Sequence, residues 1–319
     1  MKTDLLDRNV KVPAEQRICL GTATFGLDYG ITNQQGKPSL EEIEKILALA
    51  IQCGVYQIDT AQGYGDAEER IGQIGIKDFQ VTTKTLPPRD NIQLAKWNIS
   101  KTLELSLKRL KLESCHGFLL HDTASLHADG AEKIAKQMHQ IKSEKKVSHI
   151  GFSSYDSTEA ELLCERYDFD MVQFPFNLLD RRAGETGALA RLKKKGVFVS
   201  VRSVFLQGLL LSLPRSSQWN VNLPLEAVEE FHQECQKHRV TPLRAALGFV
   251  LQEKDISSIV LGCASLEEWE EILSALKQPR VTISLSPQTN FQREMLDPRT
   301  WGTGSPLAIA TKKHKEKDP

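Results

Sequence analysis

The stretch YQIDTAQGYGDAEERIG at residues 56–72 places an aspartate and a tyrosine where an apolar run ends. Asp59 closes the run, and Tyr64 lies five residues later in a polar segment. A phenol has an unperturbed pKa of about 10 and donates its proton poorly at neutral pH. A neighbouring ammonium would lower that pKa by favouring the phenolate. Tyr64 is therefore a candidate general acid if another part of the chain brings a cation to it.

Two further residues of suitable chemistry end the next two apolar runs. Lys84 closes FQVTTK, and His121 closes GFLLH. Lys84 can supply the ammonium, Asp59 can hold it charged and in place, and His121 can polarise a carbonyl oxygen. Taken singly, each residue also has an ordinary structural role, as a cap, a packing residue or a solvated charge. Their convergence favours the proton side of a carbonyl reduction, for which a cofactor supplies the hydride.

The elements that must position these residues are eight apolar runs alternating with amphipathic patterns. We expect strands at 18–24, 55–60, 79–84, 117–121, 148–154, 171–176, 197–203 and 256–262. We expect helices at 39–53, 68–74, 92–110, 130–143, 158–167, 187–195, 225–238, 242–252 and from 265 onward. Eight alternations with short links predict a single-domain (β/α)8 TIM barrel, in which chemistry gathers at the carboxyl ends of the strands. A doubly wound sheet would need G-x-G-x-x-G, which LGTATFG lacks.

The single domain is expected to span residues 1–319, with a barrel core over about 17–278, a segment at 279–305 over the barrel mouth and a flexible tail at 306–319. Charge is balanced, with 41 Lys and Arg against 41 Asp and Glu, which gives no electrostatic footprint for nucleic acid. The six cysteines are scattered without a C-x-x-C pair, so no metal site or disulfide framework is predicted. With no signal segment and no run of about 18 apolar residues, we expect a cytoplasmic protein without a membrane partner, either a monomer or a weak homo-oligomer.

The stretch DTAQGYG at residues 59–65 resembles the D-T-A-x-x-Y-G signature of the aldo-keto reductases. The lysine of VTTK and the histidine of FLLHD also close the strands at which that family has them, and the resemblance runs from LGTATFG to the last helix. It implies an NAD(P)H-dependent reductase of a small aldehyde or ketone. In that case Tyr64 would be the proton donor, with Lys84 and Asp59 tuning it. His121 would orient the carbonyl.

The resemblance also implies a nicotinamide pocket, which this chain keeps in part. Ser153 and Gln173 match residues that bind the carboxamide, whereas Ser154 replaces the usual asparagine. Arg202 stands where an aromatic residue is expected to stack on the nicotinamide. A planar guanidinium can stack there, pair with a carboxylate or contact a phosphate. The expected cofactor-binding residues are Gly21, Thr22, Ser153, Ser154, Gln173, Arg202, Ser203, Phe205, Gln207, Gly208, Gly262, Ser265 and Glu268.

The adenosine end of the expected pocket is GCASLEEWEEI at residues 262–272. Ser265 matches a phosphate-binding or helix-capping position. Glu268 stands where Gln or Arg is common and also fits position N3 of a capping box. A carboxylate repels the 2′-phosphate of NADPH but accepts a hydrogen bond from a ribose hydroxyl of NADH. We expect NADPH from the habit of the family, with NADH as the alternative that Glu268 favours.

The substrate and two rival functions stay open. RSVFLQGLLL at 202–211, NLLDRR at 177–182 and DPRTW at 297–301 are similar to a bacterial branch often associated with surface-polysaccharide or nucleotide-sugar pathways, which implies a sugar-derived carbonyl. The candidates to line the pocket are Phe25, Tyr29, Trp219 and Trp301. One rival is a non-catalytic redox sensor that binds the nicotinamide nucleotide. The other is a lyase or aldolase that forms a Schiff base on Lys84, which requires a lowered pKa that Asp59 would oppose.

Overall fold

The structure, a computed structural model, describes residues 14–212, 224–283, 285, 293–298 and 301. Within this part of the chain, eight parallel strands close into one barrel in the order β1 to β8. The strands are β1 (Ile18–Gly21), β2 (Gln57–Asp59), β3 (Gln80–Thr85), β4 (Cys115–Leu120), β5 (Val147–Ser153), β6 (Met171–Pro175), β7 (Phe198–Arg202) and β8 (Ser258–Gly262). The predicted (β/α)8 barrel is confirmed.

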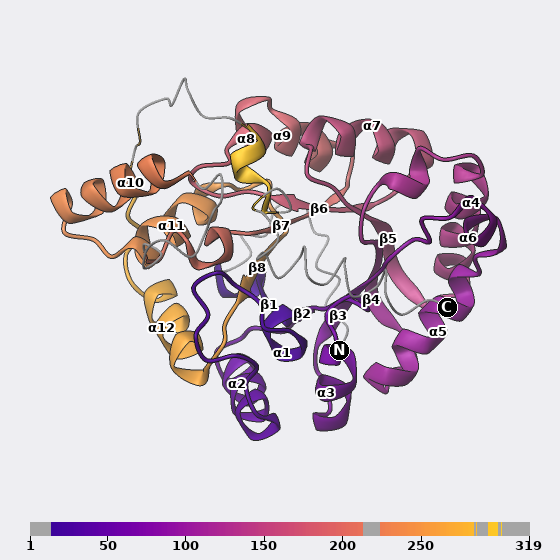
Figure 1. Ribbon diagram of the computed structural model, residues 1–319, viewed down its shortest axis with the longest axis horizontal. Coiled ribbons are helices and arrows are strands. Elements are labelled where there is room, and N and C mark those ends of the chain that lie inside the picture. The colour runs from indigo at the N-terminus through magenta and orange to yellow at the C-terminus, as the bar shows by residue number, and fades with distance from the viewer. Residues whose placement is uncertain (1–13, 213–223, 284, 286–292, 299–300, 302–319) are drawn as a thin grey trace.

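Helices surround the strands on all sides (Figure 1). They are α1 (Ala23–Gly26), α2 (Leu40–Gln52), α3 (Ala67–Ile74), α4 (Asn91–Lys96), α5 (Ile99–Leu110), α6 (Ala131–Ser143), α7 (Ser157–Tyr167), α8 (Arg182–Glu185), α9 (Ala188–Lys194), α10 (Leu225–Lys237), α11 (Pro242–Gln252) and α12 (Leu266–Leu276). Short 3-10 helices lie at Ala14–Arg17, Ala124–Leu126, Leu206–Gly208 and Arg293–Leu296. None of these helices is both long and apolar enough to cross a membrane, within the residues described.

Two predicted elements differ from the structure. The single helix expected at 92–110 is divided into α4 and α5, because the side chain of Asn98 accepts a hydrogen bond from the Lys101 amide and starts a new helix there. The first strand ends at Gly21 rather than continuing to residue 24, since the chain turns directly into the short helix α1. The turn is held by the Thr22 amide, which donates to the carbonyl of Asp59 at 3.0 Å.

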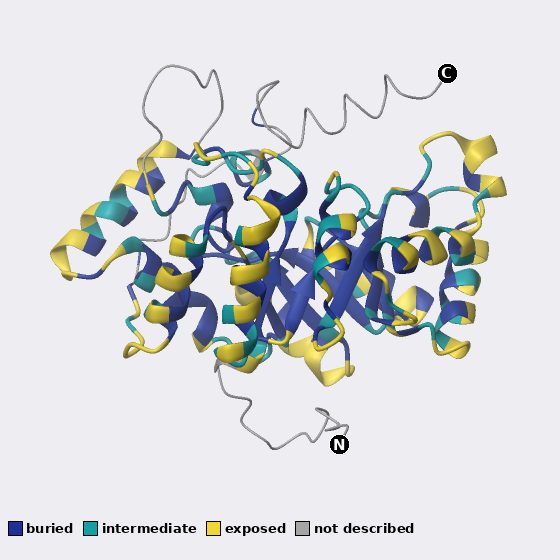
Figure 2. Ribbon diagram, turned by 90° about the horizontal axis from the view of Figure 1, so that it is seen from below, coloured by how far each residue is buried: buried dark blue, intermediate teal, exposed yellow. Residues whose placement is uncertain are grey.

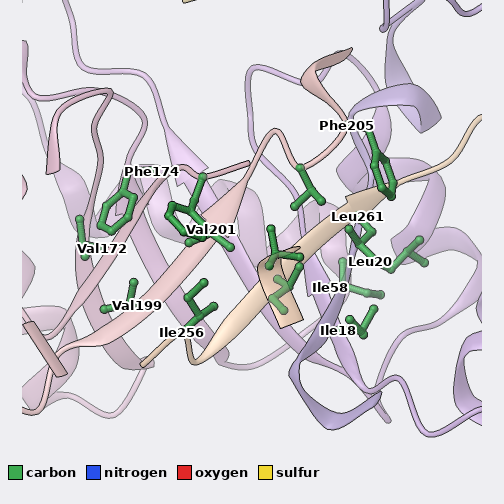
Figure 3. Close-up of a cluster of buried hydrophobic side chains, with 14 of the residues drawn as sticks. Ile18, Leu20, Ile58, Val172, Phe174, Val199, Val201, Phe205, Ile256 and Leu261 are labelled. Atoms are coloured by element: carbon green, nitrogen blue, oxygen red, sulfur yellow. The ribbon is translucent and has the colours of Figure 1, made fainter. Parts of the chain in front are cut away.

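Two kinds of side chain alternate along the strands, as the pleat of a β-strand requires. Polar side chains point into the barrel, because Gln173 of β6 bonds Asp59 of β2 although these strands are not neighbours in the sheet. Leu20, Ile58 and Leu261 point outward and pack together in one apolar cluster (Figure 3). Figure 2 shows that the strands are mostly buried and that the exposed residues of the helices lie on their outer faces. The hydrophobic core thus lies between strands and helices, and the barrel interior carries polar groups.

Candidate active site

The sequence-predicted catalytic residues converge at the carboxyl ends of three adjacent strands. Asp59 is the last residue of β2, Lys84 is the last but one of β3, and His121 follows β4 directly. Tyr64 lies in the loop between β2 and α3. Residues that follow successive parallel strands share one edge of the barrel. The structure therefore places all four in the region that the barrel topology predicts.

Lys84 and Asp59 form a salt bridge that is closed off from solvent. Nζ of Lys84 lies 2.5 Å from Oδ1 of Asp59 and also donates to the carbonyl of Thr60 at 2.9 Å. The two side chains are 0% and 4% exposed. The other carboxylate oxygen of Asp59 accepts a hydrogen bond from Nε2 of Gln173 at 2.8 Å. A charge buried this deeply depends on its partner, so Asp59 holds Lys84 in place.

Tyr64 and His121 lie next to this salt bridge. Both residues are partly buried, and their rings meet edge to face with centroids 5.5 Å apart. Nζ of Lys84 lies 5.0 Å from the centroid of the Tyr64 ring. Nδ1 of His121 is buried and has no hydrogen-bond partner among the described residues. A phenol and an unsatisfied imidazole nitrogen thus share one side of the buried ion pair.

The loop that carries Tyr64 is held in place by close packing and by a hydrogen bond that the sequence motifs did not predict. Gly26 of α1 packs so closely against this loop that a Cβ there would overlap the carbonyl of Tyr64. Gly65 has a φ of 60° and packs in turn against the carbonyl of Gly26, so a side chain there would be strained as well as crowded. Gln62 donates to Oγ of Ser106 on α5 at 2.9 Å. The only sequence signal for these supports was the pair of glycines themselves.

The electrostatics of Tyr64 differ from the sequence expectation. Burial raises the pKa of Tyr64 above its ordinary value, and the charge of Asp59 raises it further. Arg202 acts in the opposite direction and lowers the pKa of Tyr64. Arg202, rather than Lys84, is the group that acts to lower this pKa, and the net shift is upward. Tyr64 therefore keeps its proton throughout the neutral pH range.

Burial also lowers the pKa of both neighbouring bases. The pKa of Lys84 is lowered by burial, and Asp59 acts against that shift. The pKa of His121 is held well below its ordinary value by burial, then by the positive charges of Lys84 and Arg202. The imidazole is therefore neutral at neutral pH and carries one N–H donor. A protonated phenol and a neutral imidazole together can bind and protonate a carbonyl oxygen.

The residues expected to bind a nicotinamide carboxamide lie beside this site. Ser153 ends β5 and pairs in register with Gln173 of β6. Gln173 is fully buried, and its Oε1 accepts no hydrogen bond from the described residues. A carboxamide has two N–H donors and one acceptor. The unsatisfied oxygen of Gln173 and the hydroxyl of Ser153 are therefore suited to such a group.

The side chain of Ser154 is not directed at a cofactor in the way that the family resemblance implied. Its hydroxyl lies 2.5 Å from Oε2 of Glu159 and 3.1 Å from the carbonyl of Asp156, and it accepts a hydrogen bond from the Asp156 amide. These local partners occupy the donor that an asparagine would direct at a carboxamide. In this arrangement the prediction that the Ser154 side chain binds the cofactor is not supported.

The loop after β7 carries four of the expected cofactor residues, Ser203, Phe205, Gln207 and Gly208. It has positive φ at Ser203, Leu206, Gln207 and Gly208. Gly208 packs against Thr32, and a Cβ at Gly208 would overlap the Thr32 hydroxyl. The loops after β1 and β7 therefore meet, as expected for a pocket formed between them.

Arg202 ends β7 and stacks on a residue that the sequence analysis missed. Its guanidinium lies 4.2 Å from the ring centroid of Tyr155. It also donates to Oγ of Ser203 at 3.2 Å and contacts Oγ of Ser153 at 3.4 Å. The aromatic residue directly after GFSS was the signal for Tyr155 that could have been used. Of the three roles considered for Arg202, pairing with a carboxylate is not observed among the described residues.

The remaining cofactor candidates lie at the ends of β1 and β8. Gly21 and Gly262 pair in register as the last residues of these strands, and Thr22 follows β1. Oγ of Ser265 accepts the amide of Glu268 at 3.2 Å and caps α12. The Glu268 carboxylate accepts the amide of Ala264 at 2.6 Å. Both side chains therefore serve the start of α12, which agrees with the capping interpretation.

The candidates for the substrate pocket separate into two groups. Phe25 and Trp301 are 0% and 1% exposed and belong to the hydrophobic core. Tyr29 is partly buried in the loop after β1. Trp219 and the predicted tail at 306–319 lie outside the described residues. Tyr29 is thus the candidate whose position still fits a pocket wall.

The chain is similar in sequence to known reductases. Two relatives from Escherichia coli (strain K12) are an NADH-specific methylglyoxal reductase, 25% identical over 78% of this chain and 85% of that protein, and an L-glyceraldehyde 3-phosphate reductase, 24% identical over 81% of this chain and 85% of that protein. Neither name refers to surface polysaccharides or nucleotide sugars, so that finer expectation has no support from these relatives.

The fold and the sequence profile lead to the same family. An aldo/keto reductase from Klebsiella pneumoniae, solved in complex with NADP and acetate, superposes with a TM-score of 0.59 at 21% identity, covering 85% of this chain and 88% of that one. At that identity the likeness shows the fold alone. The sequence profile of the Aldo/keto reductase family matches residues 17–284. The chain therefore belongs to the aldo/keto reductase family and is an NAD(P)H-dependent oxidoreductase.

Proposed function

We propose that the protein reduces a small aldehyde or ketone to an alcohol, with Tyr64 as the proton donor. The observation that carries this proposal is the protonated phenol of Tyr64 beside neutral His121, with ring centroids 5.5 Å apart. The buried ion pair of Lys84 and Asp59 lies next to Tyr64 and His121. The substrate class includes small aldehydes such as those that name the two relatives, and sugars or sugar-derived carbonyl compounds.

The roles of the residues follow from their protonation states. The reduced nicotinamide supplies a hydride to the carbonyl carbon when it is bound. His121 is neutral and can donate a hydrogen bond that orients the carbonyl oxygen. Tyr64 transfers its proton to that oxygen as negative charge develops there. The phenolate left on Tyr64 is stabilised by Arg202, whose charge lowers the pKa of Tyr64.

The same geometry disfavours the Schiff-base hypothesis. An amine attacks a carbonyl only when it is neutral and reachable. Burial does lower the pKa of Lys84. However, the side chain is 0% exposed, and Nζ is held by Asp59 and Thr60. In this position Nζ of Lys84 is not accessible to a substrate carbonyl.

We propose NADPH as the cofactor, with NADH as the alternative that Glu268 favours. Ser153 and Gln173 would hold the carboxamide, and the loops after β1, β7 and β8 would hold the phosphates and the adenosine. The Glu268 carboxylate is already bonded to the Ala264 amide, which reduces its ability to repel a 2′-phosphate. Dissociation constants for NADPH and NADH, measured on the wild type and on Glu268→Gln, would decide between the two. A gain for NADPH in the variant would show that Glu268 acts against it.

The role of Tyr64 is tested by Tyr64→Phe, with Tyr56→Phe as a matched control. Tyr56 is 45% exposed, and the same change there should leave activity unaltered. Loss of a general acid typically lowers the rate by about 10²- to 10⁴-fold. We therefore expect kcat for methylglyoxal or L-glyceraldehyde 3-phosphate to fall by that factor in Tyr64→Phe. The dissociation constant for the cofactor should stay within about twofold.

Two outcomes would contradict the proposal. Full reductase activity in Tyr64→Phe would remove Tyr64 from the chemistry. Tight cofactor binding by the wild type without turnover of any aldehyde, ketone or aldose would favour the redox-sensor hypothesis instead.

A further inference from the structure

Arg202 is a cation at the mouth of the barrel, and the contacts seen for it within the described part of the chain are to uncharged groups. Its guanidinium stacks on Tyr155 at 4.2 Å. It contacts Oγ of Ser153 at 3.4 Å and Oγ of Ser203 at 3.2 Å, and a third contact at 3.4 Å is to the carbonyl of Ser154. A guanidinium has five N–H donors and no acceptor. These uncharged contacts hold the side chain but do not neutralise it.

Arg202 forms no ion pair with Asp59, Asp180 or Glu159. Three acidic side chains at this end of the barrel are each bound to another residue. Asp59 is paired with Lys84, Asp180 is paired with Arg182, and Glu159 is bonded to His127. None of these three carboxylates therefore neutralises the charge of Arg202.

The charge of Arg202 acts where the redox chemistry takes place. It lowers the pKa of both Tyr64 and His121, the two groups that face the carbonyl oxygen. A hydride donor must stand about 3 to 3.5 Å from the carbonyl carbon in a reactive complex. The nicotinamide ring must therefore occupy the same mouth as the guanidinium. The oxidised ring carries a positive charge, whereas the reduced ring is neutral.

We propose that Arg202 makes this site discriminate between the two redox states of the cofactor, so that the reduced nucleotide binds more tightly than the oxidised one. This inference rests on the proposed function, since it takes the nicotinamide to lie beside Ser153 and Tyr64. Two positive charges a few ångströms apart at a protein surface repel strongly enough to change a binding constant by roughly ten- to a hundredfold. The neutral ring meets no such repulsion and can stack on the planar guanidinium.

This discrimination favours the direction of carbonyl reduction. Arg202 would hold the neutral reduced cofactor more firmly than the oxidised one and would so favour release of the oxidised form after hydride transfer. The charge of Arg202 also stabilises the phenolate that forms on Tyr64 in the same step. One side chain thus supports both proton transfer and product release.

Isothermal titration calorimetry tests the inference on the full-length protein. Dissociation constants for NADPH and NADP+, and for NADH and NAD+, are measured on the wild type, Arg202→Met and Arg202→Lys. Met keeps an unbranched apolar stem without charge, and Lys keeps the charge without the planar group. We expect the wild type to bind the reduced form at least tenfold more tightly than the oxidised form. Arg202→Met should narrow that ratio at least fivefold, mainly by tightening the oxidised form, and Arg202→Lys should keep it.

The outcomes separate this inference from the proposed function. If Arg202→Met weakens both forms equally and leaves the ratio unchanged, Arg202 contacts a phosphate and the inference is overturned while the reductase proposal stands. If the wild type binds both forms equally well, the inference is again overturned alone. If the wild type binds neither form, the proposed function fails and the inference fails with it. The circular dichroism spectrum of each variant shows whether it has folded, and Arg202→Gln replaces Arg202→Met if that variant has not.

Discussion

Asp59→Asn should strongly destabilise the protein, because it leaves the ammonium of Lys84 buried without a counter-charge. Nζ of Lys84 is 2.5 Å from Oδ1 of Asp59 and 2.9 Å from the Thr60 carbonyl, and in the variant both acceptors are uncharged. Removing one partner of a buried ion pair typically costs roughly 3 to 5 kcal/mol. At 0% and 4% exposure, this pair belongs to that buried class rather than to the surface class. We expect Asp59→Asn to lose that much free energy of unfolding at pH 7.

The loss should depend on pH in a direction that follows from Lys84. Burial already lowers the pKa of Lys84, and Asp59 opposes that shift. Without Asp59 the pKa falls further, so the folded variant binds fewer protons than the unfolded chain between that value and about 10.4. Stability rises with pH wherever the unfolded state binds more protons. The defect of Asp59→Asn should therefore be largest around neutral pH, where Asp59 of the wild type is ionised, and should shrink as the pH approaches 10.

Urea denaturation followed by tryptophan fluorescence measures these differences across pH. The matched control is the double variant Asp59→Asn, Lys84→Met, because removing both charges removes the uncompensated ammonium. Replacing both partners of a buried pair is often nearly neutral, so the double variant should be clearly more stable than Asp59→Asn. The reasoning is refuted if Asp59→Asn costs less than about 1 kcal/mol, or if the double variant is no more stable than the single one.

Two further predictions concern the barrel itself. Gly151→Ala places a Cβ on the Met171 carbonyl and should cost roughly 1 to 3 kcal/mol or more by forcing β5 and β6 apart. Gly262→Ala meets nothing closer than the Gly21 carbonyl at 3.8 Å and should cost much less in the same urea assay, so equal losses would contradict the packing argument. Burial, and then His149, lower the pKa of His116 from 6.5 to about 4, so the unfolded chain binds more protons and stability is lost as the pH falls from about 6.5 to about 4. The free energy of unfolding should fall by roughly 3 kcal/mol over that window, and less in His116→Gln; identical pH dependence in both proteins would refute the assignment.

Much of the fold could be predicted because its signals are local. Apolar runs of strand length alternate with helical patterns, and caps such as Ser39, whose side chain accepts the Glu42 amide, mark where helices begin. Closure of eight such units into a barrel then follows from the rules of parallel sheets. The break before α5 was not predicted, because buried apolar residues occur on both sides of it, at Leu94 and at Ile99. There the cap at Asn98 prevailed over the periodicity.

The candidate site could be predicted in position but not in all its contacts. Asp59, Lys84 and His121 follow strands, so the barrel topology brings them to one edge. Ser154 was assigned to the cofactor from its place in a motif. The hydroxyl of Ser154 instead donates a hydrogen bond to Glu159 in the first turn of α7. Local competition of this kind is decided by side-chain conformations that a motif does not specify.

The sequence by itself determined the order of the strands, the residue types at their ends and the family to which the chain belongs. Only the tertiary structure decided which groups meet and with what charge. Gln173 bonds Asp59 from 114 residues away, and the pKa of Tyr64 is raised rather than lowered. The physical reason is that desolvation and Coulomb interactions depend on distance and burial in space. Separation along the chain does not encode either quantity.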